Sequence, residues 1–271
     1  MKEVIEKLAE EWCANGINKN DTVLIHSSLF RTLRRFRQQG IPLEPNDVLV
    51  SFQRAVGDEG TIVLPLFLRL KLSLPNLGFN KDVLFDIRTT PSQMGLLTEV
   101  ARCHSKAIRT GHPINSFVAL GYNAVAFKDI VNFSGYGADS PFAILRALNG
   151  KIAVLDLFDQ NSMTFYHHVE EMENVDYRHH ITFQVLYRGF DGEPIERSFG
   201  LFVRKLHWNV VTYVEPMGER LWELGFYHGN RPGKGSGLRV ISANALYDAT
   251  ADVIRSGKSL GMLYRIENKI Q

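Results

Sequence analysis

The stretch DTVLIHSSL, residues 21–29, decides the fold class. Its Val-Leu-Ile run is typical of a strand buried on both faces, and it ends in the polar turn His26-Ser27-Ser28. A helix is expected from Pro45 to about residue 56, and the run TIVLP at 61–65 follows as a second buried strand. This order predicts a βαβ unit in a mostly parallel sheet, and ligands of such sheets bind beyond the carboxyl ends of the strands.

The remaining segments extend this pattern over the whole chain. Residues 151–157 predict a third buried strand, and residues 164–173 predict a helix. Residues 182–214 alternate and are rich in aromatic side chains, with a turn at Asp191-Gly192, which predicts antiparallel strands at the sheet edge or in a small subdomain. We therefore expect one large α/β domain over residues 1–271, with a central, mostly parallel sheet flanked by helices and an antiparallel C-terminal extension.

Composition excludes several classes of protein. Hydrophobic residues make up 45% and charged residues 22%, as in an ordinary globular protein, and the net charge of +2 is too small for a typical nucleic-acid binder. The charged N-terminus does not resemble a signal peptide, and no stretch approaches the roughly 20 apolar residues of a membrane span. A cytoplasmic protein is expected, in which Cys13 and Cys103 are ordinary thiols.

The clearest candidate for chemistry is a cluster of histidines and glutamates. On a helix, Thr164, His167 and Glu170 share one face, and a carboxylate beside an imidazole suits a general base. His168 and Glu171 form an alternative pair one residue further on. Taken alone, a helix of this composition is more often a solvated surface than a site. A metal site would use His167, Glu171, His179 and His180, but their spacing matches no diagnostic motif.

Three further segments are weaker signals. The turn at residues 26–28 offers hydroxyl and backbone donors at a strand end, and Arg109, His112 and Ser116 surround a proline corner that can bind an anion or merely hydrogen-bond itself. The glycine-rich residues 233–237 permit close approach of a ligand but match no phosphate-binding motif. A basic cluster can hold a small anionic ligand or lie on a solvated helix end; it comprises Arg31, Arg34, Arg35 and Arg37.

In order and spacing, these segments resemble the aminoglycoside 3-N-acetyltransferase family, which has the antibiotic N-acetyltransferase fold. One matching motif, TFYHHVE at 164–170, corresponds to the family's Thr-x-x-His-x-x-Glu. The resemblance covers nearly the whole chain and is weakest at about 65–83 and 182–231. The other matching segments are residues 21–29, 56–65, 90–99, 109–116, 139–142, 150–155 and 233–243.

The resemblance implies transfer of an acetyl group from acetyl-CoA, or of another short acyl group from acyl-CoA, in a ternary complex, to a primary amine of an amino sugar or aminoglycoside-like acceptor. It implies that His167 is the general base, that Glu170 orients it, and that Thr164 belongs to the same motif. It also implies a set of residues along the path of the CoA co-substrate: His26, Ser27, Ser28, Leu29, Phe30, Arg31, Arg109, His112 and Ser116. No metal is implied.

One departure concerns the acceptor side, which the resemblance places at about 182–231. Family members that modify antibiotics carry acidic residues after the histidine helix, whereas residues 197–208 here are basic and aromatic, and Arg69 and Lys71 add positive charge. We therefore expect a small amine acceptor that is anionic or neutral, such as a nucleotide-linked amino sugar, rather than a polycationic drug. The sequence is also compatible with a homodimer of this chain. The competing hypotheses are a catalytically idle CoA-binding protein of the same fold and a metal-dependent hydrolase.

Overall fold

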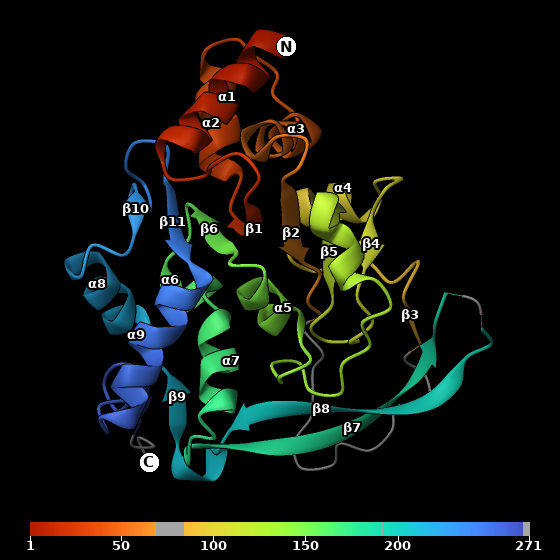
Figure 1. Ribbon diagram of the computed structural model, residues 1–271, viewed down its shortest axis with the longest axis vertical. Helices are drawn as coiled ribbons and strands as arrows, with labels where there is room; N and C mark the ends of the chain where they lie inside the picture. Colours follow the sequence, from red (N-terminus) through yellow and green to blue (C-terminus); the bar gives the residue numbers. More distant parts are fainter. Residues whose placement is uncertain (69–83, 191, 268–271) are drawn as a thin grey trace.

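The computed structural model describes residues 1–68, 84–190 and 192–267. The expectations for Arg69, Lys71 and position 191 lie outside the described residues. A seven-stranded sheet has the order β10-β11-β6-β1-β2-β5-β4 (Figure 1). Its strands are β1 (Thr22–Ser27), β2 (Thr61–Pro65), β4 (Ile108–Arg109), β5 (Phe117–Gly121), β6 (Lys151–Leu155), β10 (His228–Gly229) and β11 (Leu238–Ser242).

The predicted parallel arrangement is confirmed at the centre of this sheet, and with it the α/β fold class. β1 runs parallel to both β2 and β6, in a register that places Val23 opposite Ile62 and Leu24 opposite Ile152. The outer strands β11, β10, β5 and β4 add antiparallel pairings, whose direction the apolar runs alone do not reveal. The carboxyl ends of β1 and β6 therefore lie side by side at one edge.

Helices cover both faces of the sheet. One layer contains α1 (Lys2–Ala14), α3 (Pro45–Val56) and α4 (Leu96–Arg102), which pack on Val23 and Ile25, beside α2 (Phe30–Gln38). The opposite layer packs on Leu24 and Ile152. It contains α5 (Pro141–Ala147), α6 (Asp159–Ser162), α7 (Phe165–Met172), α8 (Glu215–Glu223) and α9 (Ala243–Arg255). The alternation of side chains along each strand produces these two cores.

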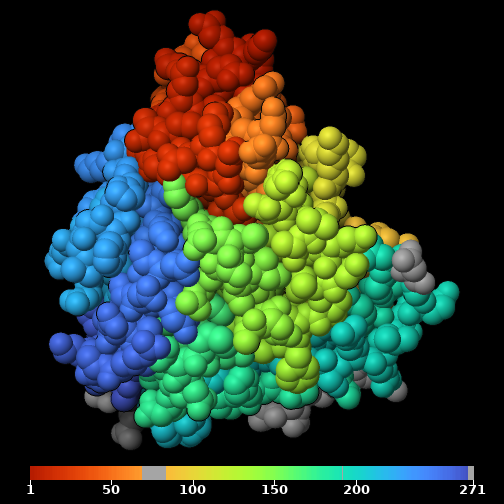
Figure 2. Space-filling view, viewed as in Figure 1, coloured from red at the N-terminus to blue at the C-terminus, as the bar shows by residue number. Residues whose placement is uncertain are grey.

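The predicted antiparallel extension is a long hairpin of β7 (Arg178–Arg188) and β8 (Ile195–Arg204), to which β3 (Leu84–Asp86) adds a parallel strand. The hairpin starts directly after α7 and lies at the end of the molecule opposite α1 (Figures 1 and 2). It forms a separate sheet rather than an edge of the main one. A third, two-stranded sheet joins β9 (Val210–Thr212) to β12 (Tyr264–Ile266).

Local contacts define the start of α3 and the surroundings of the basic cluster. The N-cap of α3 is Glu44, and Asp47 completes a capping box by accepting a hydrogen bond from the Glu44 backbone N–H at 2.9 Å. Two of the four clustered arginines are held by carboxylates, Arg31 by Asp156 and Arg35 by Glu11. Both cysteines are free. Among the described helices, none has the length and apolarity that crossing a membrane requires.

Candidate active site

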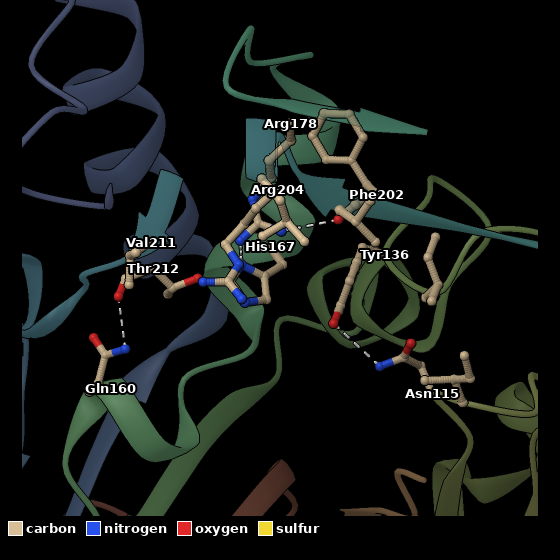
Figure 3. Close-up of a pocket in the computed structure, with 13 residues that line it drawn as sticks. Asn115, Tyr136, Gln160, His167, Arg178, Phe202, Arg204, Val211 and Thr212 are labelled. Atoms are coloured by element: carbon tan, nitrogen blue, oxygen red, sulfur yellow. Dashed lines mark hydrogen bonds between the residues drawn. The ribbon is translucent and has the colours of Figure 1, made fainter. Parts of the chain in front are cut away.

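A cavity of about 520 Å³ lies between α7 and the strands β8 and β9. Figure 3 shows His167 at its centre beside Arg204, with Asn115 and Tyr136 on one side and Val211 and Thr212 on the other. The complete lining is Ile114, Asn115, Tyr136, Gln160, His167, Arg178, Leu201, Phe202, Val203, Arg204, Leu206, Val211 and Thr212. His167 is thus the one predicted site residue whose side chain lines this cavity within the described chain.

α7 positions His167 and Glu170 three residues apart on one face, as predicted. Nδ1 of His167 lies 2.7 Å from Oε2 of Glu170, whose side chain is fully buried, whereas the side chain of His167 is 18% exposed. The hydroxyl of Tyr177 donates to Oε1 of Glu170 at 2.9 Å. The buried carboxylate of Glu170 therefore fixes the orientation of the imidazole, and the other side of the ring faces the cavity.

Arg178, at the start of β7, closes the same cluster. Its Nε lies 2.7 Å from Oε2 of Glu170, and one of its terminal nitrogens donates to the Phe202 carbonyl at 3.0 Å. The Nε contact is an ion pair by distance but not an aligned hydrogen bond. The other terminal nitrogen lies 2.8 Å from Nδ1 of His167. Because Nδ1 carries at most one hydrogen, it either donates to Glu170 or accepts from Arg178.

The charges in this cluster perturb its titration. Burial alone would raise the pKa of Glu170, but the charge of Arg178 and the hydrogen bonds from His167 and Tyr177 outweigh it, so that the pKa lies below its ordinary value. Burial and then the charge of Arg178 lower the pKa of His167, against the raising effect of Glu170. Arg204 lowers it further. At neutral pH the site therefore combines an ionised carboxylate with a neutral imidazole.

The alternative pair, His168 and Glu171, points elsewhere. His168 is buried, and its Nδ1 donates to the Tyr136 carbonyl at 2.7 Å. Glu171 accepts a hydrogen bond from the hydroxyl of Ser134 at 2.8 Å, and burial raises its pKa. Neither side chain lines the cavity. No group of three or more His, Cys, Asp or Glu side chains in the described chain is arranged to hold a metal ion.

The turn after β1 lies at the carboxyl edge of the main sheet. His26 is buried, and burial together with the charge of Arg239 lowers its pKa to about 4. Ser27 and Ser28 are half-buried, Leu29 is buried and is the N-cap of α2, and Phe30 is 72% exposed. The guanidinium of Arg31 is held at 2.9 Å by Asp156, beside the backbone of residues 233–235.

The proline corner forms a separate group around β4 and β5. Arg109 is buried and donates to the Thr90 carbonyl at 2.5 Å and to the hydroxyl of Ser116 at 3.2 Å. Burial lowers the pKa of Arg109 to about 10 and that of His112 to about 4. Nε2 of His112 donates to the Gly200 carbonyl at 3.1 Å, which fastens this corner to β8. The corner reaches the cavity through its neighbouring residues Ile114 and Asn115.

Thr164 is the N-cap of α7, and its buried hydroxyl has no hydrogen-bond partner within the described residues. Sequence spacing did not identify three important side chains as site residues: Tyr136, Tyr177 and Arg178. Tyr177 and Arg178 depend on the turn that folds β7 back against α7, Tyr136 comes from the loop before α5, and no motif marks either segment. Arg204 belonged to the basic stretch 197–208, but the spacing alone did not separate it from its neighbours.

Comparisons with known proteins agree with this architecture. The family model described as aminoglycoside 3-N-acetyltransferase matches residues 24–255. Aminoglycoside N(3)-acetyltransferase VII of Streptomyces paromomycinus is 25% identical over 219 residues, which cover 71% of this chain and 68% of that protein.

Two solved structures share the fold. AAC-IIIb in a binary complex with CoASH has a TM-score of 0.77 and 20% identity, with coverage of 93% of this chain and 96% of that one. AAC-VIa bound to sisomicin has a TM-score of 0.78 and 19% identity, with coverage of 94% and 98%. The predicted enzyme class, an acyltransferase, is confirmed, and the chain belongs to the aminoglycoside 3-N-acetyltransferase family.

Proposed function

We propose that this enzyme transfers an acetyl or other short acyl group from acyl-CoA directly to a primary amine, with His167 as the general base. The observation that carries the proposal is the imidazole that lines the cavity of about 520 Å³ while a buried carboxylate holds its Nδ1 at 2.7 Å. A base on this side of the cavity is what an amine acceptor requires, because an alkylammonium ion has no lone pair with which to attack a thioester.

The tautomer of His167 follows from the competition at Nδ1. We assign its hydrogen to the bond with Glu170, since that carboxylate oxygen is fully buried and the nearby Nε of Arg178 does not supply an aligned hydrogen. The lone pair of Nε2 is then available to accept a proton. Glu170 and Arg178 are positioning residues in this scheme, because they act through the imidazole.

The proposed reaction balances without an acyl-enzyme. The amine nitrogen bonds to the thioester carbonyl carbon as Nε2 of His167 takes a proton from it. The tetrahedral intermediate then collapses by breaking the carbon–sulfur bond, and the leaving sulfur receives the proton from the imidazolium. Because the acceptor enters as an ammonium ion, the products are an amide, CoASH and one further proton that the nitrogen releases to solvent, and His167 returns to its neutral form.

We also propose that the acyl-CoA co-substrate passes the turn at the end of β1, as the family resemblance implies. The hydroxyls of Ser27 and Ser28 have no hydrogen-bond partner within the described residues, and the backbone N–H groups that open α2 precede its helical hydrogen bonds. These donors fit the carbonyl and phosphate oxygens of such a molecule. AAC-IIIb, whose fold this chain shares, was solved with CoASH, which supports the same choice of co-substrate. The roles of Arg109, His112 and Ser116 in that path remain predictions.

A pair of matched variants tests the base. Thiol release from acetyl-CoA is measured with a panel of amines, and CoASH binding is measured by calorimetry. In His167→Gln, we expect kcat to fall by roughly 10²–10⁴, the contribution of a positioned general base, with CoASH affinity retained. In His168→Gln, turnover should persist, because that side chain lies outside the cavity.

Two results would refute the proposal. Turnover by His167→Gln at the wild-type rate would exclude this histidine as the base. A wild-type protein that binds CoASH but releases no thiol with any amine would instead favour the idle binding protein.

A further inference from the structure

The cavity beside His167, where we place the amine acceptor, has a positively charged lining. Its described lining contains the guanidinium groups of Arg178 and Arg204 but no carboxylate. The nearest buried carboxylate, Glu170, faces His167 and Arg178 rather than the open space. Among the described residues, a polycationic amine entering this cavity would meet two guanidinium groups, of which only that of Arg178 is ion-paired, and this repulsion costs free energy.

The two arginines differ in how they are used. Arg178 is committed to the fold through Glu170 and the Phe202 carbonyl. Arg204, at the end of β8, is half-buried and has no hydrogen bond or ion pair within the described part of the chain. An arginine remains charged at neutral pH even where burial lowers its pKa, as it does here. A half-buried guanidinium without a partner is a site that an anion can fill.

Neighbouring groups reinforce this imbalance. Lys205 lies next in sequence and stacks on the ring of Trp208 with its ammonium 4.1 Å from the ring centre. Burial is the largest cause that lowers the pKa of His179, and the neighbouring His207 and Lys205 lower it further. On the opposite side of the cavity lies Asn115, whose amide nitrogen donates to the hydroxyl of Tyr136 at 3.5 Å. The described lining therefore has neutral polar groups at one side and the cation of Arg204 beside His167 (Figure 3).

We propose that the acceptor carries a phosphate group near its reactive amine, and that Arg204 binds this phosphate while His167 faces the amine. This inference rests on the proposed function, because it names the class of amine that the acyltransferase uses. Phosphate suits the planar guanidinium, which can donate two parallel hydrogen bonds to it. The phosphate can belong to a simple amino sugar phosphate or to the diphosphate of a nucleotide-linked amino sugar.

The experiment uses three probes with the same amine: glucosamine, glucosamine 1-phosphate and UDP-glucosamine. Calorimetry in the presence of CoASH measures their affinities for the wild-type protein, Arg204→Gln and the control Lys205→Gln. The control removes an equal charge one residue away, from a side chain outside the cavity lining. The wild type should bind at least one phosphorylated probe at least tenfold more tightly than glucosamine. This ratio should fall to within threefold of one in Arg204→Gln and should persist in Lys205→Gln.

The comparison of the two phosphorylated probes separates their sources. Tighter binding of UDP-glucosamine assigns the diphosphate, and tighter binding of glucosamine 1-phosphate assigns the monoester. Equal affinity for all three probes, tighter binding of kanamycin than of any of them, or a phosphate preference that survives in Arg204→Gln would overturn the inference. A raised KM for acetyl-CoA in Arg204→Gln, with the phosphate preference retained, would assign this arginine to the co-substrate instead.

Failure of the proposed function gives a different result. A phosphate preference that depends on Arg204, without thiol release from acetyl-CoA, would refute acyl transfer while leaving the anion site in place. Thiol release with no such preference would refute the anion site alone.

Discussion

Replacing Glu170 by glutamine separates the two consequences of its buried carboxylate. The side chain is fully buried and lies 2.7 Å from both Nδ1 of His167 and Nε of Arg178, and it also accepts a hydrogen bond from Tyr177. Glutamine preserves the shape and one oxygen acceptor but removes the negative charge. Arg178, whose side chain is only 5% exposed, then has no counter-ion.

The expected loss in the free energy of unfolding follows from the burial of this ion pair. Removing one partner of a buried ion pair costs about 3–5 kcal/mol, because the remaining charge stays desolvated. We expect the urea concentration at the midpoint of unfolding to fall accordingly, while the m-value, the slope of the free energy of unfolding against urea concentration, stays the same. The double variant Glu170→Gln/Arg178→Gln should recover about 1–3 kcal/mol as coupling energy. A matched control is Glu173→Gln, whose partner Arg255 is 62% exposed, and which should lose far less stability because solvent screens that pair.

The consequence for catalysis has a definite sign. Glu170 raises the pKa of His167, whereas Arg178 lowers it, so the substitution leaves the lowering influence unopposed. The acid limb of the kcat profile should therefore move to lower pH, and kcat should fall by roughly a hundredfold because the base is weaker and less well held. A loss of stability below about 1 kcal/mol, or an acid limb that stays in place or moves to higher pH, would refute this account of the cluster.

Two further predictions concern other parts of the fold. Burial lowers the pKa of three histidines to about 4, so below pH 6.5 the unfolded chain binds protons that the folded chain does not. The free energy of unfolding, measured with urea, should therefore fall by about 1 kcal/mol per histidine between pH 6.5 and 5.5. A free energy of unfolding that does not change over this range would contradict the prediction. These histidines are His26, His112 and His168. In Gly237→Ala, at a φ of +76°, the new methyl group would collide with the carboxylate of Asp156 and displace Arg31. We expect a KM for acetyl-CoA raised at least about fivefold in steady-state assays, with strain of about 1–3 kcal/mol, whereas an unchanged KM would separate this loop from the co-substrate path.

The centre of the sheet was predictable because its strands are buried on both faces. β1, β2 and β6 are continuous apolar runs, and a strand covered by helices on either side permits little else. The helix that carries His167 was also predictable, since its apolar positions repeat at helical spacing. These features depend on local pattern alone. By contrast, the antiparallel direction of β5 and β11 depends on how the connecting segments travel, and their composition does not record it.

The candidate site shows the same division. Three-residue spacing on one helix places His167 beside Glu170, so local pattern is enough to predict that pair. The partners Tyr177 and Arg178 come from the next element and reach Glu170 only because the chain reverses between α7 and β7. Asn115 and Tyr136 enter the cavity from loops whose course is set by tertiary hydrogen bonds, such as that between His112 and the Gly200 carbonyl. The spacing of residues along the sequence does not predict tertiary contacts of this kind.

The base and the proposed anion site are linked through charge. Arg178 and Arg204 both lower the pKa of His167, and only the first of them is neutralised by Glu170. A phosphate bound to Arg204 would cancel part of the second influence and return the pKa of His167 toward its ordinary value, which strengthens the base when the acceptor arrives. A polycationic acceptor would have the opposite effect, since it adds positive charge beside the imidazole. The anion would therefore contribute to binding and to proton abstraction together, and this double effect would explain how a cavity whose described lining has no carboxylate can still suit an amine.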